Sequence, residues 1–289
     1  MRRALVLAVP AAWLLLFLAA PLLIVLKISL SAGADGVPPY APLLDWSHGF
    51  PPALDAVTDS YALLVQDDHY LRAFLRSLQI AAVSSAACLL LGYPMALAIA
   101  RAPERWRGAL LMGVMLPFWT GFLLRINAWI GLLADDGWIN AALVALGIIA
   151  QPAHLLYTNL AMYIGIVYCY LPFMVLPLYA RLSKLDPLLE EAAADLGATP
   201  WRSFRAITLP LSLPGITAGL MLVFIPAVGE YVIPDLLGGP QALTAGRVLW
   251  EEFFQNRDWP TASAVAVVLL VLLLIPASIL QWRQGRAGA

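Results

Sequence analysis

Charged side chains are scarce in this sequence. Of its 289 residues only 12% are Asp, Glu, Lys or Arg and 62% are apolar, whereas a soluble domain has roughly 25% charged residues. The formal net charge of −1 excludes a chain-wide basic field for nucleic acid, so no nucleic-acid partner is expected and charge matters only locally. The composition predicts a protein whose main solvent is not water.

Cysteine and histidine are also rare, with two and three residues respectively. Cys88 and Cys169 lie inside uncharged apolar stretches without metal-ligand spacing, so neither a disulfide framework nor a zinc site is expected. Both are interpreted as small packing residues. The histidines, His48, His69 and His154, are scattered over segments assigned below to the outer side, and no metal site is predicted there.

Long uncharged runs are what the sequence has instead. A bilayer core about 30 Å thick needs about 20 apolar residues in one helix. Four runs free of Asp, Glu, Lys and Arg are long enough, at residues 4–26, 77–100, 206–229 and 259–282. Two further spans are predicted within residues 155–180 and 109–133, the second interrupted by Arg125. We therefore predict an all-α membrane protein with six transmembrane helices in one domain, residues 1–289.

Two apolar stretches allow another interpretation. Residues 138–150 are too few to cross a bilayer, so they are predicted to form an interfacial or re-entrant helix. The first run, 4–26, has basic residues before it and small residues after it, as a secretory signal does. Its apolar part exceeds the roughly 7–15 residues of such a signal, which favours a span.

The distribution of charge predicts the orientation. With an even number of spans both termini lie on one side, and cytoplasmic loops carry an excess of Lys and Arg. The basic residues assigned to that side are Arg2, Arg3, Arg101, Arg105, Arg107, Arg181, Lys184, Arg202, Arg205, Arg283 and Arg286. The acidic residues of the opposite loops are Asp35, Asp45, Asp55, Asp59, Asp67, Asp68, Asp135, Asp136, Asp235, Glu251, Glu252 and Asp258. Both termini are therefore predicted to be cytoplasmic, and the Pro- and Asp-rich loop 31–71 to form an outward, periplasmic cap with short helical pieces.

The cytoplasmic loop 181–208 contains the most specific pattern, which continues into the next span as EAAADLGATPWRSFRAITLP. Asp186 before a proline is typical of a helix start. Gly197 is typical of a left-handed helix end, and Thr199 before a proline starts a second short helix. Pro210 marks the return to the membrane. The pattern predicts two short helices held outside the bilayer, which we call the bracket.

This segment resembles the EAA loop of ABC importer permeases, which reads Glu-Ala-Ala, three residues, Gly, nine residues, then Ile-x-Leu-Pro. Every fixed position of that motif is present, at Glu191, Ala192, Ala193, Gly197, Ile207, Leu209 and Pro210. The alternative of a solvated connector does not account for so many fixed positions at fixed spacings. The resemblance implies a type I importer permease fold whose coupling helices dock on an ATPase subunit.

Three further stretches, residues 116–133, 224–240 and 246–260, resemble the polyamine branch of these permeases, closest to the putrescine importers. The resemblance implies a periplasmic binding protein that delivers the substrate, a second permease subunit and two ATPase subunits. No stretch reads GxxxxGK followed by Ser or Thr, so ATP and Mg²⁺ are expected on the ATPase partner and the chain itself is expected to be no enzyme.

Ionisable residues at membrane depth line a pathway or pair with a partner. The candidates for a substrate path are Glu230, Tyr231, Asp235, Trp119, Trp129 and Tyr170. In one interpretation the carboxylates meet a cationic amine and the rings offer cation–π contacts. In the other, Glu230 pairs with Arg125 and the aromatics only pack or anchor the helices. Both remain open for Glu230, whereas for Arg125 a structural role is favoured because a cation repels a cationic substrate.

Three alternatives to a polyamine permease were weighed. A permease of the same ABC class for another small solute fits the bracket equally well. A secondary transporter would show an internal repeat relating two halves of the chain, and none is found in the sequence. A membrane enzyme would need a motif such as HExxH or GxSxG, and neither is present.

Overall fold

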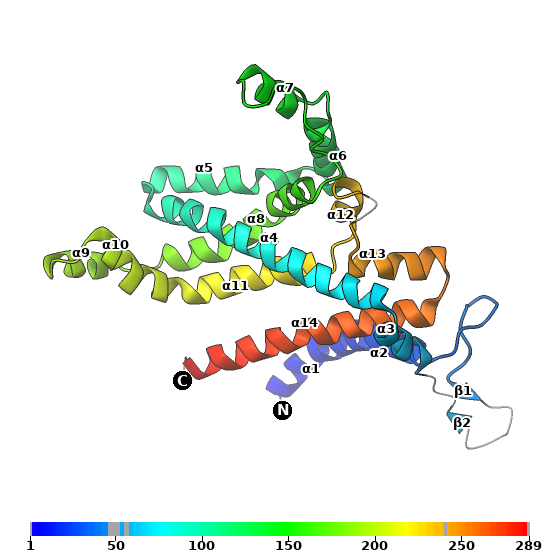
Figure 1. Cartoon of the computed structure of the whole chain (residues 1–289). Coiled ribbons are helices and arrows are strands. Elements are labelled where there is room, and N and C mark those ends of the chain that lie inside the picture. The colour runs from blue at the N-terminus through cyan, green and yellow to red at the C-terminus, as the bar shows by residue number, and fades with distance from the viewer. Residues whose placement is uncertain (1, 46–52, 55–57, 240–241, 288–289) are drawn as a thin grey trace. The chain divides into compact units, whose positions relative to one another are not determined.

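The computed structural model describes all residues except 1, 46–52, 55–57, 240–241 and 288–289 (Figure 1). His48 and Asp55 therefore lie outside the described residues, as do the side chains of Arg2, Arg3, Arg283 and Arg286. The described chain divides into two compact units, which are considered separately. Unit 1 comprises Met1–Leu75 and Thr244–Ile279, and unit 2 comprises Arg76–Leu243 and Leu280–Ala289.

Unit 1 contains the first span and most of the last helix. Its elements are α1 (Arg2–Leu14), the π-turn η1 (Leu15–Ala19), α2 (Ala20–Ser29), β1 (Leu44–Asp45), β2 (Ala53–Leu54), α3 (Asp59–Gln66), the start of α4 (Asp68–Arg101), α13 (Ala245–Trp250), the π-turn η4 (Glu251–Gln255) and α14 (Trp259–Ala287). The helix predicted over 4–26 is confirmed, because α1, η1 and α2 follow one another without a break in the helical backbone.

The segment predicted as an outward cap contains short elements. Strands β1 and β2 pair antiparallel, with Leu44 opposite Leu54, and α3 is the helical piece that was expected. Helix α4 begins at Asp68, within the last residues of the predicted cap, and the bounds 31–71 of the cap stay a prediction. The backbone N–H of His69 donates to the Asp67 carboxylate at 2.8 Å, and such a cap stabilises a helix start there.

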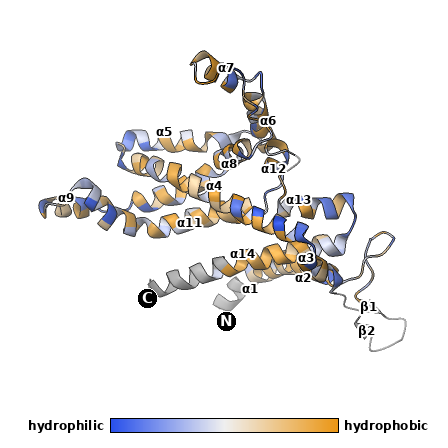
Figure 2. Ribbon diagram, viewed as in Figure 1, coloured by the Kyte–Doolittle hydropathy of each residue, from blue (hydrophilic) through white to orange (hydrophobic). Residues whose placement is uncertain are grey.

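Unit 2 contains the remaining helices. Apart from most of α4, they are α5 (Glu104–Met115), the 3₁₀ turn η2 (Leu116–Trp119), α6 (Phe122–Leu133), α7 (Trp138–Ala145), α8 (Asn159–Leu182), α9 (Leu188–Asp195), α10 (Pro200–Ser203), the π-turn η3 (Phe204–Thr208), α11 (Leu209–Val228) and α12 (Val232–Leu237). Figure 2 shows mostly apolar residues along α11 and along α4 beyond its hydrophilic first turns, as expected of helices that face lipid and one another.

The core of unit 2 lies where α8 meets α4 and α11. Met174 of α8 approaches both neighbours at glycines: a Cβ atom would lie 3.0 Å from its Cγ at Gly92 and 2.6 Å from its Sδ at Gly219. At Gly215 a Cβ atom would likewise lie 3.0 Å from the carbonyl oxygen of Pro177. Gly215 and Gly219 have the GxxxG spacing that lets membrane helices approach closely. Cys88 is buried in this core as a free thiol, which agrees with its predicted packing role.

Several of the described helices are long and apolar enough to cross a membrane. They are Ala8–Ser29, Asp68–Arg101, Asn159–Leu182 and Pro200–Val228. A bent pair, Glu104–Trp119 with Phe122–Ala145, makes a fifth if it counts as one span, and the apolar part of α14, Trp259–Ile275, is shorter. The helical membrane architecture is thus confirmed, and the number of six spans stays a prediction.

The segment predicted as a span over 109–133 is bent and does not form one continuous helix. The two helices of the bent pair meet at 91°, with the break between η2 and α6. Pro117 lies in the 3₁₀ turn without a backbone N–H to donate, and Thr120 and Gly121 have extended ψ angles of 145° and 142°. The run of apolar residues concealed this break because hydropathy does not report backbone geometry.

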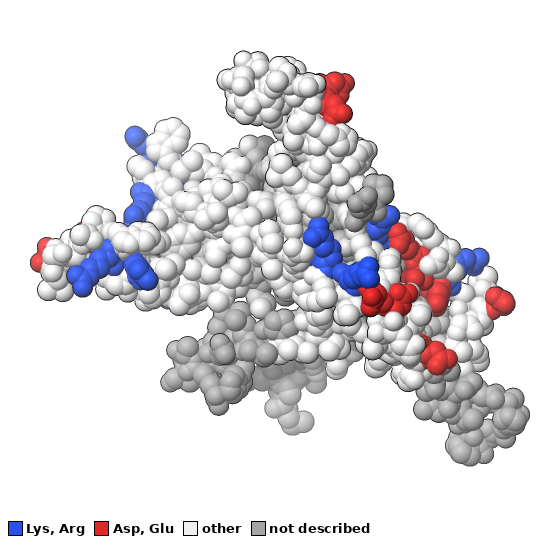
Figure 3. Space-filling view, viewed as in Figure 1, with Lys and Arg blue, Asp and Glu red and all other residues white. Residues whose placement is uncertain are grey.

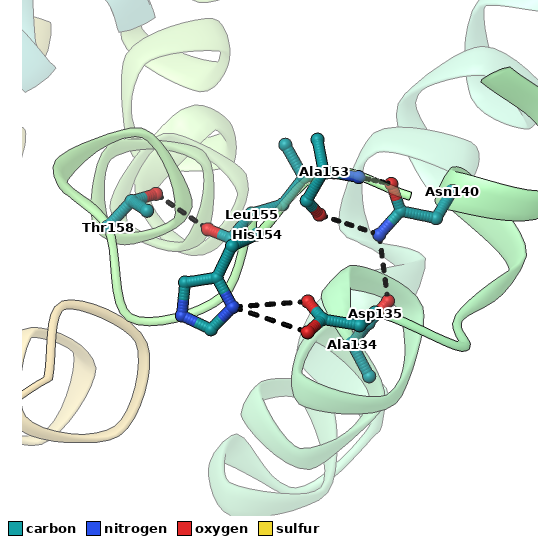
Figure 4. A network of polar contacts seen from close by, with 7 residues as sticks. All are labelled: Ala134, Asp135, Asn140, Ala153, His154, Leu155 and Thr158. Carbon is teal, nitrogen blue, oxygen red and sulfur yellow. Dashed lines mark hydrogen bonds and ion pairs between the residues drawn. The ribbon is translucent and has the colours of Figure 1, made fainter. Parts of the chain in front are cut away.

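A polar network fixes the turn between α6 and α7 (Figure 4). The buried Asn140 side chain donates to the carbonyls of Ala134 and Ala153 at 3.1 and 2.9 Å, and it accepts from the Ala153 N–H at 2.9 Å. His154 lies 3.2 Å from Asp135. Helix α7 is the short helix predicted within 138–150, and its place at the membrane interface stays a prediction.

Candidate functional site

The bracket folds as its sequence pattern predicted. The Leu188 N–H donates to the Asp186 carboxylate at 3.0 Å at the start of α9, and Thr199 accepts from the Arg202 N–H at 3.4 Å at the start of α10. Between the two helices Gly197 has a φ of +80°. The Ala198 N–H reaches back to the Ala193 carbonyl at 2.9 Å. This backbone pattern is typical of a helix end with a left-handed glycine.

The end of the bracket differs from the prediction. Pro210 does not separate the second short helix from the span, because α10, η3 and α11 form one helix of 29 residues, Pro200–Val228. The Leu209 N–H bonds to the Phe204 carbonyl, five residues back. Such a widened turn lets a helix absorb a proline, whose missing N–H would otherwise leave a gap in the i to i−4 ladder. The second arm of the bracket is therefore continuous with α11.

The residues of the EAA motif divide into exposed and inward-facing groups. Glu191 and Ala192 are exposed on α9 and Ala193 is half-buried. Ile207 lines a hollow of about 440 Å³, and Leu209 packs against the core of unit 2. The motif thus combines exposed residues on α9 with residues that pack inward.

Glu190 is a polar residue of the bracket that sequence reasoning missed. Its carboxylate accepts from Arg101 at 2.7 and 2.9 Å and from the Thr208 hydroxyl at 2.6 Å. It thereby connects α9 with the last residue of α4 and the last residue of η3. The adjacent Glu191 carries the motif, and nothing in the local pattern distinguishes a second glutamate beside it.

Glu230 lies two residues beyond the end of α11, at the start of α12. Its Oε1 accepts from the backbone N–H groups of Val232 and Ile233 at 3.1 and 3.3 Å, and the Tyr170 hydroxyl donates to its Oε2. A carboxylate at a helix N-terminus stabilises the free N–H groups there. Of the predicted path residues, the structure thus brings Tyr170 and Glu230 into direct contact.

The other predicted path residues have different surroundings. Trp129 packs edge-on against Tyr168 with ring centroids 5.4 Å apart, and Trp119 is 81% exposed in η2. Tyr231 and Asp235 are half-buried at the start of α12. The six residues therefore do not form one continuous cluster of contacts in the described part of the chain.

Arg125 lies against aromatic rings. Its guanidinium carbon is 5.3 Å from the ring centre of Phe118 and 5.8 Å from that of Phe122. Its Nε and Nη1 atoms are buried and have no hydrogen-bond partner among the described residues. The rings at the α5–α6 break therefore provide cation–π contacts for Arg125, whereas the hydrogen bonds of Glu230 described above come from Tyr170 and α12.

Comparison with known proteins decides the family. Residues 88–284 match the profile of the binding-protein-dependent transport system inner membrane component. The chain belongs to this family. The expectations of an ABC importer permease, located in the inner membrane, and of a subunit that is not an enzyme are thereby confirmed.

Among the relatives of this permease are proteins named spermidine/putrescine transport system permease protein PotB. The one from Haemophilus influenzae is 39% identical over 268 residues, covering 93% of this chain and 89% of that protein. The one from Escherichia coli is 41% identical over 228 residues, covering 79% and 82%. The predicted resemblance to the polyamine branch is confirmed by these relatives.

Solved structures support the importer fold. A bacterial ABC transporter involved in the import of the acidic polysaccharide alginate matches with a TM-score of 0.66 at 21% identity, over 96% of each chain. The MetNI methionine ABC transporter matches with a TM-score of 0.54 at 18% identity, over 76% of this chain and 95% of that one. At these identities the likeness concerns the fold, which is the predicted importer permease fold.

Proposed function

We propose that this permease imports a polyamine, with putrescine as its substrate, and that ATP hydrolysis on a partner drives the import. The observation that carries the proposal is the complete bracket, which is open to a partner on α9 and continuous with a membrane helix through α10. The PotB relatives, at about 40% identity over most of the chain, support a polyamine over other small solutes.

The proposed complex contains four kinds of chain. Two ATPase subunits bind ATP and Mg²⁺, and one of them receives Glu191, Ala192 and Ala193 of this chain. A second permease subunit completes the membrane core, and a periplasmic binding protein delivers the substrate. The anchoring residues Gly197, Ile207, Leu209 and Pro210 hold the docking face in place.

We propose that the bracket and both termini lie in the cytoplasm. Figure 3 shows Lys and Arg side chains around α9 and α10, with an acidic side chain beside them at the α9 tip, a second basic patch over the start of α4, and acidic side chains at the tip that carries α7. An excess of basic residues marks cytoplasmic loops. On the proposed outer side, Arg72 and Arg247 are paired with acids, at 3.0 Å from Asp68 and 2.8 Å from Glu251.

The proposed substrate path passes the junction of α11 and α12. A diammonium substrate loses hydration on entering a low-dielectric path, and a carboxylate beside aromatic rings compensates part of that loss. Glu230 with Tyr170 supplies both kinds of group at this junction, and Tyr231 and Asp235 follow directly. Trp119 and Trp129 belong to the path as ring faces on α5–α6.

Uptake by the complete transporter tests the proposal. The permease is produced with its second permease, ATPase and binding protein in cells lacking other polyamine importers, and uptake of radiolabelled putrescine and spermidine is measured. We expect energy-dependent putrescine uptake that excess unlabelled putrescine abolishes and excess spermidine lowers less. Uptake of neither amine would contradict the proposal and favour another small solute of the same transporter class.

A further inference from the structure

Glu190 occupies an unusual position in the bracket. Helix α9 is exposed over most of its length, and Glu190 is one of its few half-buried residues. Its carboxylate is shared by two donors from different elements: Arg101, the last residue of α4, and Thr208, the last residue of η3. Thr208 is fully buried, so the hydrogen bond from its hydroxyl is shielded from water.

A hollow lies directly behind this carboxylate. It has a volume of about 440 Å³ and is lined by residues from the ends of α4 and α8, from α9 and from the start of the long helix, among them Leu97, Leu182, Leu189 and Leu211. Because packed side chains do not fill this space, α9 is not held against α4 by a continuous apolar interface. The hydrogen bonds of Glu190 cross the gap at its rim.

The chain itself provides only indirect connections between α9 and α4. In one direction α9 continues through Pro187 into α8, and in the other through Gly197 into α10 and α11. A side-chain link to α4 therefore adds a third connection, to a helix that lies far away in sequence. Movement of α9 along its docking face would reach α4 chiefly through Arg101 and Glu190.

We propose that Glu190 acts as a clamp, with Arg101 and Thr208, that passes displacement of the bracket to α4 and α11 together. This inference rests on the proposed docking of α9 on an ATPase. Glu190 is a positioning residue in this scheme and contacts neither nucleotide nor substrate. Since half-exposed ion pairs contribute little to stability, the clamp is expected to affect coupling more than folding.

The test uses the complete transporter reconstituted in liposomes, with ATP hydrolysed per substrate imported as the readout. Glu190→Ala removes the hydrogen bonds from Arg101 and from Thr208, and Thr208→Val removes only the latter. The exchange of Arg101→Glu with Glu190→Arg reverses the ion pair. Glu104→Ala is the matched control, since Glu104 is an exposed glutamate in the first turn of α5.

We expect Glu190→Ala to assemble and to hydrolyse ATP while transport falls by roughly tenfold, a typical size for a lost coupling. Thr208→Val should show a smaller loss, the reversed pair should regain part of the coupling, and Glu104→Ala should resemble the wild type. If Glu190→Ala does not assemble, the ratio of ATP to substrate in the Thr208 variant and in the reversed pair tests the clamp instead. An unchanged ratio of ATP to substrate in the Glu190 and Thr208 variants overturns the clamp.

A separate readout distinguishes failure of the clamp from failure of docking. Ala194→Cys places a thiol on the exposed face of α9 for cross-linking to cysteines in the ATPase groove. If α9 is cross-linked to the ATPase and Glu190→Ala still hydrolyses the wild-type amount of ATP per substrate imported, the clamp is rejected and the docking is retained. Absence of any cross-link from Ala194→Cys in an otherwise unchanged chain rejects the docking on which the clamp rests.

Discussion

Glu230 makes several hydrogen bonds just beyond the end of α11. Its two oxygens accept hydrogen bonds from two backbone N–H groups of α12 and from the Tyr170 hydroxyl, among other contacts. The sequence offered two interpretations of this residue, a substrate carboxylate and a partner of Arg125. The structure adds a role as the cap of α12, which is compatible with either.

The charge and the cap of Glu230 can be separated by substitution. Glu230→Gln keeps an oxygen for the Val232 and Ile233 N–H groups but removes the charge. If the carboxylate meets the substrate's ammonium group, the lost charge-assisted hydrogen bond is worth about 1.5–3 kcal/mol, so we expect transport to fall roughly tenfold or more. The amide oxygen still accepts from the backbone N–H groups, so the thermal stability of the assembled complex should change much less than transport. Tyr170→Phe, which removes one donor, is the control for the hydrogen bond alone.

A different pattern would assign Glu230 to Arg125. If the two charges depend on each other, Glu230→Gln leaves an unpaired buried cation and lowers the melting temperature of the complex. Replacing Arg125 by Gln in the same chain would then restore stability. That rescue, measured by thermal unfolding in detergent, would remove Glu230 from the substrate path.

Residue roles were predictable from sequence only where a local pattern carried them. Asp186, Gly197 and Thr199 were recognised because caps and left-handed turns depend on neighbours within a few positions. Glu190 and Glu230 each have a side-chain partner far away in sequence, at Arg101 and Tyr170 respectively. Contacts of that kind depend on tertiary packing, and the periodicity of apolar residues in the sequence does not predict them.

At the scale of helices, Gly197 determines the angle between the two arms of the bracket. Its φ of +80° is unfavourable for residues with a Cβ atom, although nothing lies within 4 Å of the place where that atom would be. Strain here is therefore a backbone effect, of about 1–2 kcal/mol for an L-residue.

We expect Gly197→Val to reach the membrane but to lose most of its coupling, because the strained turn reorients α9. Gly197→Asn should be tolerated far better, since asparagine adopts left-handed conformations more readily. The measurements are membrane content by immunoblot and uptake by the assembled transporter. Equal uptake by wild type and Gly197→Val would speak strongly against a docking role.

The close contact of α8 with α11 can be tested with two Gly→Ala substitutions that are expected to change stability in different directions. Gly219→Ala would place a Cβ atom 2.6 Å from Met174 Sδ, so we expect a loss of about 1–3 kcal/mol through overpacking. Gly113→Ala on α5 meets nothing within 4 Å and should be neutral or stabilise the helix by about 0.5–1 kcal/mol. Denaturation in detergent checks both, and equal effects at the two sites would exclude close packing at Gly219.

Hydropathy predicted the helices better than their breaks. The runs at 77–100 and 155–180 became α4 and α8, because a long apolar run in a bilayer has few alternatives to a helix. The 91° bend after η2 and the unbroken passage through Pro210 were both missed. Proline bends a helix in one place and is absorbed by a π-turn in the other, and the surrounding packing decides which occurs.

For the whole molecule, the fold and the family followed from sequence, whereas the substrate depends on contacts between chains. The sequence motif of the bracket is specific and lies within one chain, so it can be recognised from this sequence alone. In the proposed complex, two permeases share the substrate path, so each sequence would contain only part of its lining. This is why Trp119 and Trp129 could be proposed from composition but not placed around Glu230.

A further prediction concerns the behaviour of this subunit without its partners. The purified chain should neither bind nor hydrolyse ATP, and it should not transport when reconstituted alone, because it lacks the phosphate-binding motif. Equilibrium binding of a fluorescent nucleotide and phosphate release measure this. Nucleotide turnover by the chain without any partner would contradict its assignment as a permease subunit.

The unbroken helix from Pro200 to Val228 has a mechanical consequence. At 1.5 Å per residue its 29 residues form a rod about 43 Å long. If the docked end is tilted by about 10°, a stiff rod of that length moves its far end by roughly 8 Å. The far end leads directly into Glu230 and α12. On the proposed docking and path, a small rotation of the bracket would therefore move the region of Glu230 by more than the width of an ammonium group.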